Sequence, residues 1–193
     1  MHPMLGNSLP LDFLAACSAT CSSPSSCGHT LCHNYTFYPL ADIDTMQVSE
    51  NLTVDAVDVG PSGVAITEAL NFHAQFHSTH PISSGTWRIA YVVDVVGERH
   101  VLDLVSKSCD GYPTGEGEWS ICIDTSALGE VKPEVISNAG LLSVHYVPIE
   151  HAGKPFAELA DVAVMSINAI VMIQPSPDVP GTFIRLVFNP LDM

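Results

Sequence analysis

The chain has 193 residues, of which 47% are hydrophobic and only 14% are charged, a composition typical of a globular protein and not of a disordered one. It carries 21 acidic residues against 6 basic ones, a formal net charge of -15 with the histidines neutral. A field of this sign repels nucleic-acid phosphate and anionic lipid surfaces, so the composition argues against direct binding to nucleic acid or membranes and favours a basic protein partner. The alternative is that the acidity only keeps the protein soluble.

Residues 1–46 are rich in cysteine, serine and small residues and contain no Lys or Arg. This composition without hydrophobic periodicity predicts a low-complexity arm ahead of a domain over residues 47–193. Three states are open for the cysteines of the arm: free thiols in a reduced tail, two disulfides in an oxidising compartment, or thiolate ligands of a zinc ion. The zinc ligands would be Cys17, Cys21, Cys27 and Cys32.

Two apolar stretches bear on the compartment. The longer one, residues 162–173, falls short of the ~20 residues that a transmembrane helix needs. The other, residues 9–19, has no preceding Lys or Arg, which a secretory signal requires. We therefore expect an intracellular protein of the nucleus or cytoplasm, with secretion as the alternative.

Apolar and polar residues alternate through much of the chain beyond residue 51, the pattern of strands with one buried face. The clearest case is segment 70–77, in which His73 and His77 are expected to share the outer face. Its inward residues are expected to be Leu70, Phe72, Ala74 and Phe76. Further strands are predicted over 52–59, 87–93, 100–105, 119–123, 141–147, 162–173 and 182–188, with a helical turn over 156–160.

The predicted fold class is all-β, an immunoglobulin-like antiparallel β-sandwich. The four strands between residues 70 and 123 are expected to form one layer, or most of one, with Trp87 filling the core. Cys109 and Cys122 flank a glycine-rich loop, where they either form a disulfide or remain ordinary thiols.

No strong catalytic motif occurs in the sequence. There is no G-x-S-x-G elbow, Walker loop, H-E-x-x-H, EF-hand or dinucleotide fingerprint. The paired carboxylates Glu116 and Glu118, or Asp42 and Asp44, are expected in loops or tails, where they are solvated. We therefore expect a protein that is not an enzyme and has no cofactor, apart from the zinc alternative.

Several short motifs resemble those of the Asf1 family of histone chaperones, and they occur in the same order. Residues 87–92, W-R-I-A-Y-V, resemble the W-K-I-x-Y-V strand of that family. Residues 101–105 and 111–115 are similar to the strand and the glycine-containing loop that follow it. Residues 135–144 are similar to the strand after the family's acidic loop, and residues 183–186, F-I-R-L, to its F-I-R-V.

The resemblance implies an elongated sandwich that has no cofactor and binds the histone H3–H4 dimer. By motif position it places Val144, Tyr146 and Arg185 on the surface that contacts H3, and Asp103 joins them as a partner-binding candidate. The chain departs from the family at Arg99, where the family carries an acid. Residues 148–180 are also longer than the family's hairpin.

Together these features predict an acidic protein-binding module, with a histone-like basic protein as the partner. A structural subunit of a larger cytoskeletal or ciliary assembly is the second hypothesis, and a secreted, disulfide-bonded sandwich is the third. For Arg185 an internal salt bridge is the alternative to an interface role.

Overall fold

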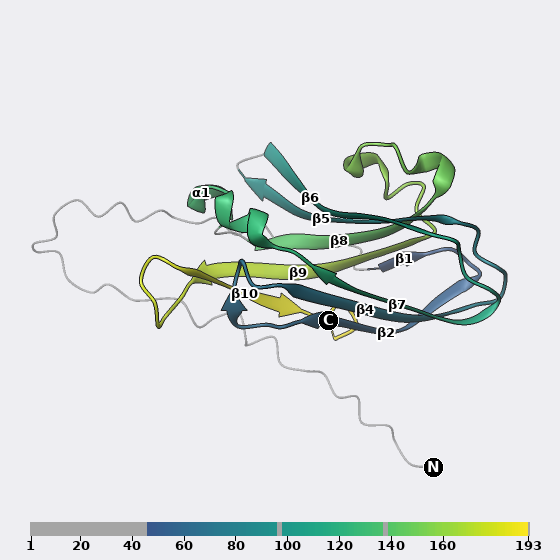
Figure 1. The fold of residues 1–193 in the computed structure, drawn as a ribbon, viewed down its shortest axis with the longest axis horizontal. Helices are drawn as coiled ribbons and strands as arrows, with labels where there is room; N and C mark the ends of the chain where they lie inside the picture. The colour runs from purple at the N-terminus through teal and green to yellow at the C-terminus, as the bar shows by residue number, and fades with distance from the viewer. Residues whose placement is uncertain (1–45, 96–97, 137–138, 193) are drawn as a thin grey trace, which may run out of the picture. The chain divides into compact units, whose positions relative to one another are not determined.

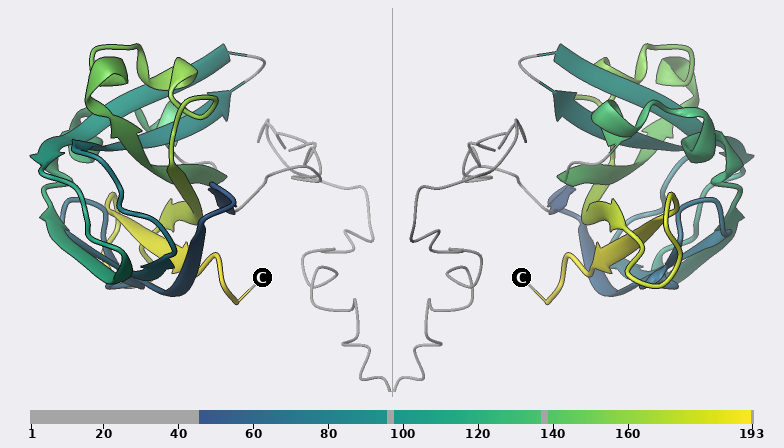
Figure 2. Two further views of the ribbon diagram at one scale, coloured as in Figure 1. Left: turned by 90° about the vertical axis from the view of Figure 1, so that its right-hand side faces the viewer. Right: turned by 90° about the vertical axis from the view of Figure 1, so that its left-hand side faces the viewer.

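The computed structural model describes residues 46–95, 98–136 and 139–192 (Figure 1). These residues form two antiparallel sheets with almost no helix, which confirms the predicted all-β sandwich. Figure 2 shows the strands gathered into these two layers. The immunoglobulin-like detail stays a prediction.

The larger sheet contains seven strands within the described residues, in the order β3-β10-β9-β8-β5-β6, with β1 also paired to β9. Every neighbouring pair in it is antiparallel. The strands are β1 (Met46–Val48), β3 (Val64–Ala65), β5 (Gly85–Val95), β6 (Glu98–Cys109), β8 (Ala139–Pro148), β9 (Met165–Pro175) and β10 (Phe183–Phe188).

The smaller sheet has three strands in the described part of the chain, in the order β2-β4-β7. They are β2 (Leu52–Gly60), β4 (Leu70–Ser78) and β7 (Gly115–Ile123). Among the described residues, short helical segments accompany the strands: η2 (Ser126–Glu130), α1 (Pro133–Ile136), η3 (Ile149–His151) and η4 (Phe156–Glu158). Each predicted strand is therefore present, and the predicted helical turn over 156–160 is η4.

The expectation that the strands between residues 70 and 123 form one layer is wrong. β4 and β7 belong to the smaller sheet, whereas β5 and β6 belong to the larger one. The chain crosses between the layers through residues 79–84 and returns through residues 110–114. These two crossings are joined by a pair of backbone hydrogen bonds between Ile82 and Tyr112, each of 2.9 Å. Alternation shows which face of a strand is buried, but not which strand lies beside it.

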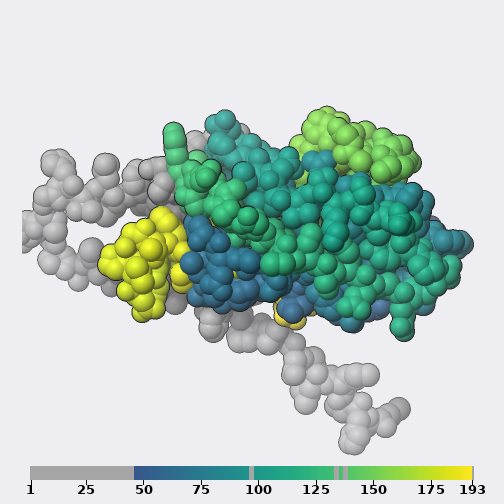
Figure 3. All heavy atoms as spheres, in the orientation of Figure 1, coloured from purple at the N-terminus to yellow at the C-terminus, as the bar shows by residue number. Residues whose placement is uncertain are grey.

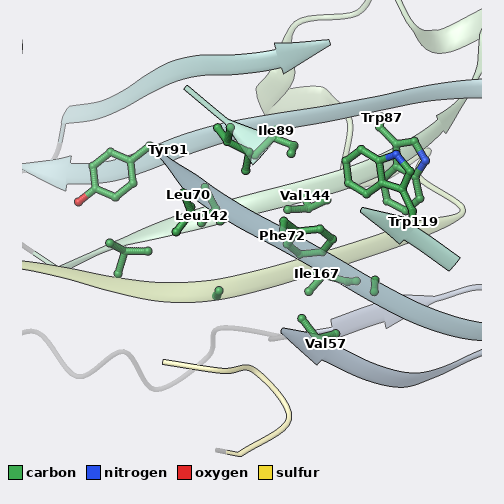
Figure 4. Packing of buried hydrophobic residues seen from close by; sticks show 14 of the residues in the cluster. Val57, Leu70, Phe72, Trp87, Ile89, Tyr91, Trp119, Leu142, Val144 and Ile167 are labelled. Atoms are coloured by element: carbon green, nitrogen blue, oxygen red, sulfur yellow. The ribbon is translucent and has the colours of Figure 1, made fainter. Parts of the chain in front are cut away.

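The core lies between the two sheets. Trp87 of β5 is fully buried and stacks on Trp119 of β7, with ring centroids 4.0 Å apart and planes 3° from parallel (Figure 4). The predicted inward face of β4 is confirmed, because the following side chains are at most 2% exposed: Leu70, Phe72, Ala74 and Phe76.

Residues 149–164 cover the outer face of the larger sheet over β5 and β8 (light green, upper right in Figures 1 and 3). Phe156 and Leu159 of this segment pack against Ala90 of β5 and Val147 of β8. Both faces of β8 are therefore covered, which explains why residues 142–147 are buried without interruption.

Several expectations concern residues 1–45, which lie outside the described residues. They include the arm up to Asp44 and the four cysteines proposed as zinc ligands. In the described domain Cys109 and Cys122 are free thiols, so no disulfide joins them. Over the same residues no group of three or more His, Cys, Asp or Glu is placed to hold a metal ion.

None of the helices in the described residues has the length and apolarity needed to cross a membrane.

Candidate functional site: the outer face of the smaller sheet

Two of the residues expected at a partner surface lie inside the sandwich. Val144 and Tyr146 are each 1% exposed. Strand alternation turns both of them towards the smaller sheet, and the Tyr146 hydroxyl donates a hydrogen bond to the Ser83 carbonyl at 2.7 Å. The expectation that these residues lie on a contact face is wrong, because both side chains are buried and inaccessible to a partner.

Arg185 is also buried, with 1% of its surface exposed. Burial lowers the pKa of its guanidinium, while the charge of Glu68 raises it. The hydrogen bonds that it donates go to the carbonyls of Pro61, Ile66, Glu68 and Ala69 and to the Thr125 hydroxyl. Arg185 is therefore not an exposed interface residue, and none of its hydrogen bonds to described residues goes to a carboxylate. It ties the loop before β4 to β10.

Asp103 is the one expected partner-binding residue that reaches the surface, on the outer face of β6. Its carboxylate accepts a hydrogen bond from Arg88 Nη2 at 3.2 Å, and Arg88 Nη1 donates to the Ala152 carbonyl at 2.9 Å. Arg88 thereby fastens the covering segment to β5 and β6. The structure does not bring Asp103 together with the three buried candidates.

The arginine side chains form hydrogen bonds to groups of the domain itself. Besides Arg88 and Arg185, Arg99 donates to the Asp94 carboxylate at 3.0 Å. The three lysines, Lys107, Lys132 and Lys154, take part in none of the ion pairs seen among the described residues. Few basic groups therefore balance the acidic exterior.

The outer face of the smaller sheet is acidic and carries no Lys or Arg, since β2, β4 and β7 contain neither residue. Asp58 of β2 and Glu116 and Glu118 of β7 are exposed and alternate with buried or half-buried positions, so they point outwards, and Asp55 is exposed at a bulge in β2. We call these four carboxylates the acidic face.

Two histidines of β4 stand between the acidic strands. His77 is paired with Glu116 in the register of the sheet, and His73 lies between Asp58 and Ser120. His73 Nε2 is 3.1 Å from Glu118 Oε1, yet it makes no hydrogen bond with a described residue. Because the Glu118 side chain is 66% exposed, its carboxylate stays accessible to a partner.

Sequence reasoning missed this face because it placed Glu116 and Glu118 in a loop. They lie in β7, where glycines occupy the inward positions that an apolar residue would normally fill. Gly117 is paired with Phe76, and a Cβ atom on Gly117 would collide with the Phe76 ring, which fills the inward position instead. The period of two in G-E-G-E-W-S-I-C-I is visible only when glycine is counted as an inward residue.

The acidic face is a surface and not a pocket. One shallow hollow lies over Asn71, His73 and Ser120, and another lies beside Arg88 and Asp103. Such open depressions offer contact area to a macromolecule and do not enclose a small ligand.

The class of protein that these observations define is a two-sheet antiparallel sandwich with an acidic outer face on its smaller sheet. The sequence matches no protein-family model, and no curated protein matches it.

Proposed function

We propose that the protein is a non-enzymatic module that binds a basic protein partner through the acidic face. The observation that carries this proposal is that three adjacent strands present four exposed carboxylates and no Lys or Arg. The formal net charge of -15 would steer a cationic partner towards the molecule, and charge complementarity would then favour the correct orientation.

A histone-like protein is the first partner to test. The motifs that resemble the Asf1 family imply the H3–H4 dimer, and histones have the charge that the acidic face would attract. The contact proposed here differs from the one implied by those motifs, since it uses the smaller sheet in place of the buried Val144, Tyr146 and Arg185. Such a partner would place the protein in the nucleus or cytoplasm.

The test is titration of the full chain with recombinant H3–H4 dimer at low and at moderate salt. The acidic-face variant carries Asp55→Asn, Asp58→Asn, Glu116→Gln and Glu118→Gln. A matched control removes the same charge from exposed carboxylates elsewhere, by Glu150→Gln, Glu158→Gln, Asp161→Asn and Asp178→Asn.

We expect the acidic-face variant to bind at least about tenfold more weakly, because each exposed charge pair contributes up to about 1 kcal/mol. The control should lose less than about threefold, since it changes only the long-range field. Equal losses in both variants, or no binding by the natural sequence, would contradict the proposal. If the protein forms a native complex that is stable at high salt and is weakened by neither variant, the structural-subunit hypothesis would be favoured instead.

A further inference from the structure

The long edge strands of the two sheets differ in how they are protected against pairing with another chain. Bulges, inward-pointing charges and covering side chains are the usual means of protection. β6 has a register shift opposite Ile89 and Ala90, and it carries Lys107 on its inward side, opposite Trp87. β2 has a bulge at Asp55, and its Val57 carbonyl accepts a hydrogen bond from Asn189 at 2.7 Å.

Among the residues that the structure describes, none of these devices protects β7. It pairs with β4 over nine residues without a register shift, and it contains no Pro, Lys or Arg. Within the described part of the chain, no strand pairs with its other edge. Its outward amides and carbonyls are therefore available for main-chain hydrogen bonds to an added strand.

The strand of the larger sheet next to the one that β7 faces is β6. In Figure 4 Phe72 of β4 lies near Val144 of β8 and Ile167 of β9, whereas Trp119 of β7 stacks on Trp87 of β5. β7 thus lies opposite β5 across the core. Among the described residues β7 is the last strand of the smaller sheet, whereas the larger sheet continues beyond β5 with β6.

The inward side chains of β6 are less completely covered than those of β5. Leu102 is paired with Tyr91, and Val105 with Ile89, so both point towards the core side of the sheet. Tyr91 and Ile89 are 3% and 0% exposed, but Leu102 and Val105 are only partly buried. A fourth strand beside β7 would cover these two apolar side chains.

Charge decides which strand fits there. A second copy of β7 would bring its own Glu116 and Glu118 against the same residues, and like charges directly opposite each other are destabilising. Residues 1–45 of the chain carry three acids, Asp12, Asp42 and Asp44, and no Lys or Arg. A basic strand from another protein is the occupant whose charge complements the edge.

We propose that the free edge of β7 takes up an extended basic segment of a partner protein as a fourth strand of the smaller sheet. Lys or Arg at every second residue of that segment faces Glu116 and Glu118, and the apolar residues between them cover Leu102 and Val105. The inference rests on the proposed function, because it specifies how the basic partner of the acidic face is held.

The probe is a ten-residue peptide that alternates Lys with Val, titrated against the full chain at low salt. Its control is the same peptide with N-methylated backbone amides, which keeps the charge and the side chains but cannot donate main-chain hydrogen bonds. We expect the unmodified peptide to bind at least about tenfold more tightly than the methylated one.

Hydrogen exchange of the complex gives the position of the peptide. Alternate amides of Gly115–Ile123, those not bonded to β4, should exchange at least about tenfold more slowly when the unmodified peptide is bound. Glu116→Gln with Glu118→Gln should weaken binding by about two- to tenfold, and the matched pair Asp55→Asn with Asp58→Asn by less.

The outcomes separate the two proposals. Equal binding of both peptides, or bound peptide without new protection in β7, overturns strand addition and leaves the basic-partner function standing. Alternate β7 amides that are already protected in the free full chain also overturn it, because the chain then covers its own edge. Failure of both peptides and of H3–H4 to bind overturns both proposals.

Discussion

Replacing Arg185 by methionine tests the internal role that the structure gives to this residue. The substitution keeps a long apolar side chain but removes the guanidinium donors from the loop before β4. The two closest acceptors are the carbonyl oxygens of Glu68 and Ala69, the latter at 2.8 Å from Nη2. The bonds to Pro61, Ile66 and Thr125 are longer, at 3.2 to 3.4 Å, and contribute less.

The expected loss follows from the two close carbonyls. An acceptor left without its donor costs about 1–3 kcal/mol when buried, and these two carbonyls are only part-buried, so the pair gives about 2 kcal/mol. The weaker buried bonds to Ile66 and Thr125 add to this and removing a charge that is costly to bury offsets part of it, so we expect a loss of about 2 kcal/mol. For a domain of this size such a loss lowers the Tm by roughly 4–8 °C.

The assay is urea unfolding followed by circular dichroism, together with a thermal scan. Arg185→Lys keeps the charge with fewer donors and should fall between the natural protein and Arg185→Met. Arg99→Met is the matched control, because it removes an ion pair whose side chains are 63% and 60% exposed, and it should lose less than about 1 kcal/mol. If Arg185→Met is no less stable than Arg99→Met, the internal role is refuted.

Three further predictions concern buried positions. Burial lowers the pKa of His145 from 6.5 to about 4, so between these values the unfolded chain binds a proton that the folded chain does not. The free energy of unfolding should therefore fall by up to about 3 kcal/mol as the pH drops through this window, and urea titrations of His145→Gln should show a smaller fall. Gly117→Ala should destabilise the domain by about 1–3 kcal/mol through its collision with Phe76, whereas Gly153→Ala, at an open position, should unfold in urea like the natural sequence. Phe156→Ala should cost about 3 kcal/mol and raise the pKa of His145 in an NMR titration, because the two rings lie 4.9 Å apart.

The strands were predictable because burial on one face leaves a period of two in the sequence. Phe72 and Phe76 alternate with polar residues, and both are buried as expected. The arrangement of the strands in layers was not predictable in the same way. It depends on the crossings through 79–84 and 110–114, whose pairing joins residues distant in the sequence and has no local pattern.

The site was harder to predict than the fold. The local sequence around an arginine in a terminal strand does not show whether its side chain contacts a partner or bonds to backbone carbonyls. The role of Arg185 could therefore not be predicted from the sequence. Glu116 and Glu118 were missed for a local reason, since the Phe76 ring fills the position that a side chain at Gly117 would take. The acidic face emerged only when the register of β2, β4 and β7 placed its carboxylates side by side.

The stacked indoles Trp87 and Trp119 give the protein an intrinsic optical reporter. They are the two tryptophans of the chain, and each comes from a different sheet. At a centroid separation of 4.0 Å their excited states couple, so near-ultraviolet dichroism and emission both depend on whether the layers are joined. Fraying of β2 or β3, which carry neither indole, would leave these spectra unchanged, whereas separation of the sheets or release of β7 would abolish the coupling. Unlabelled protein can thus distinguish opening at those strands from loss of the contact between the sheets.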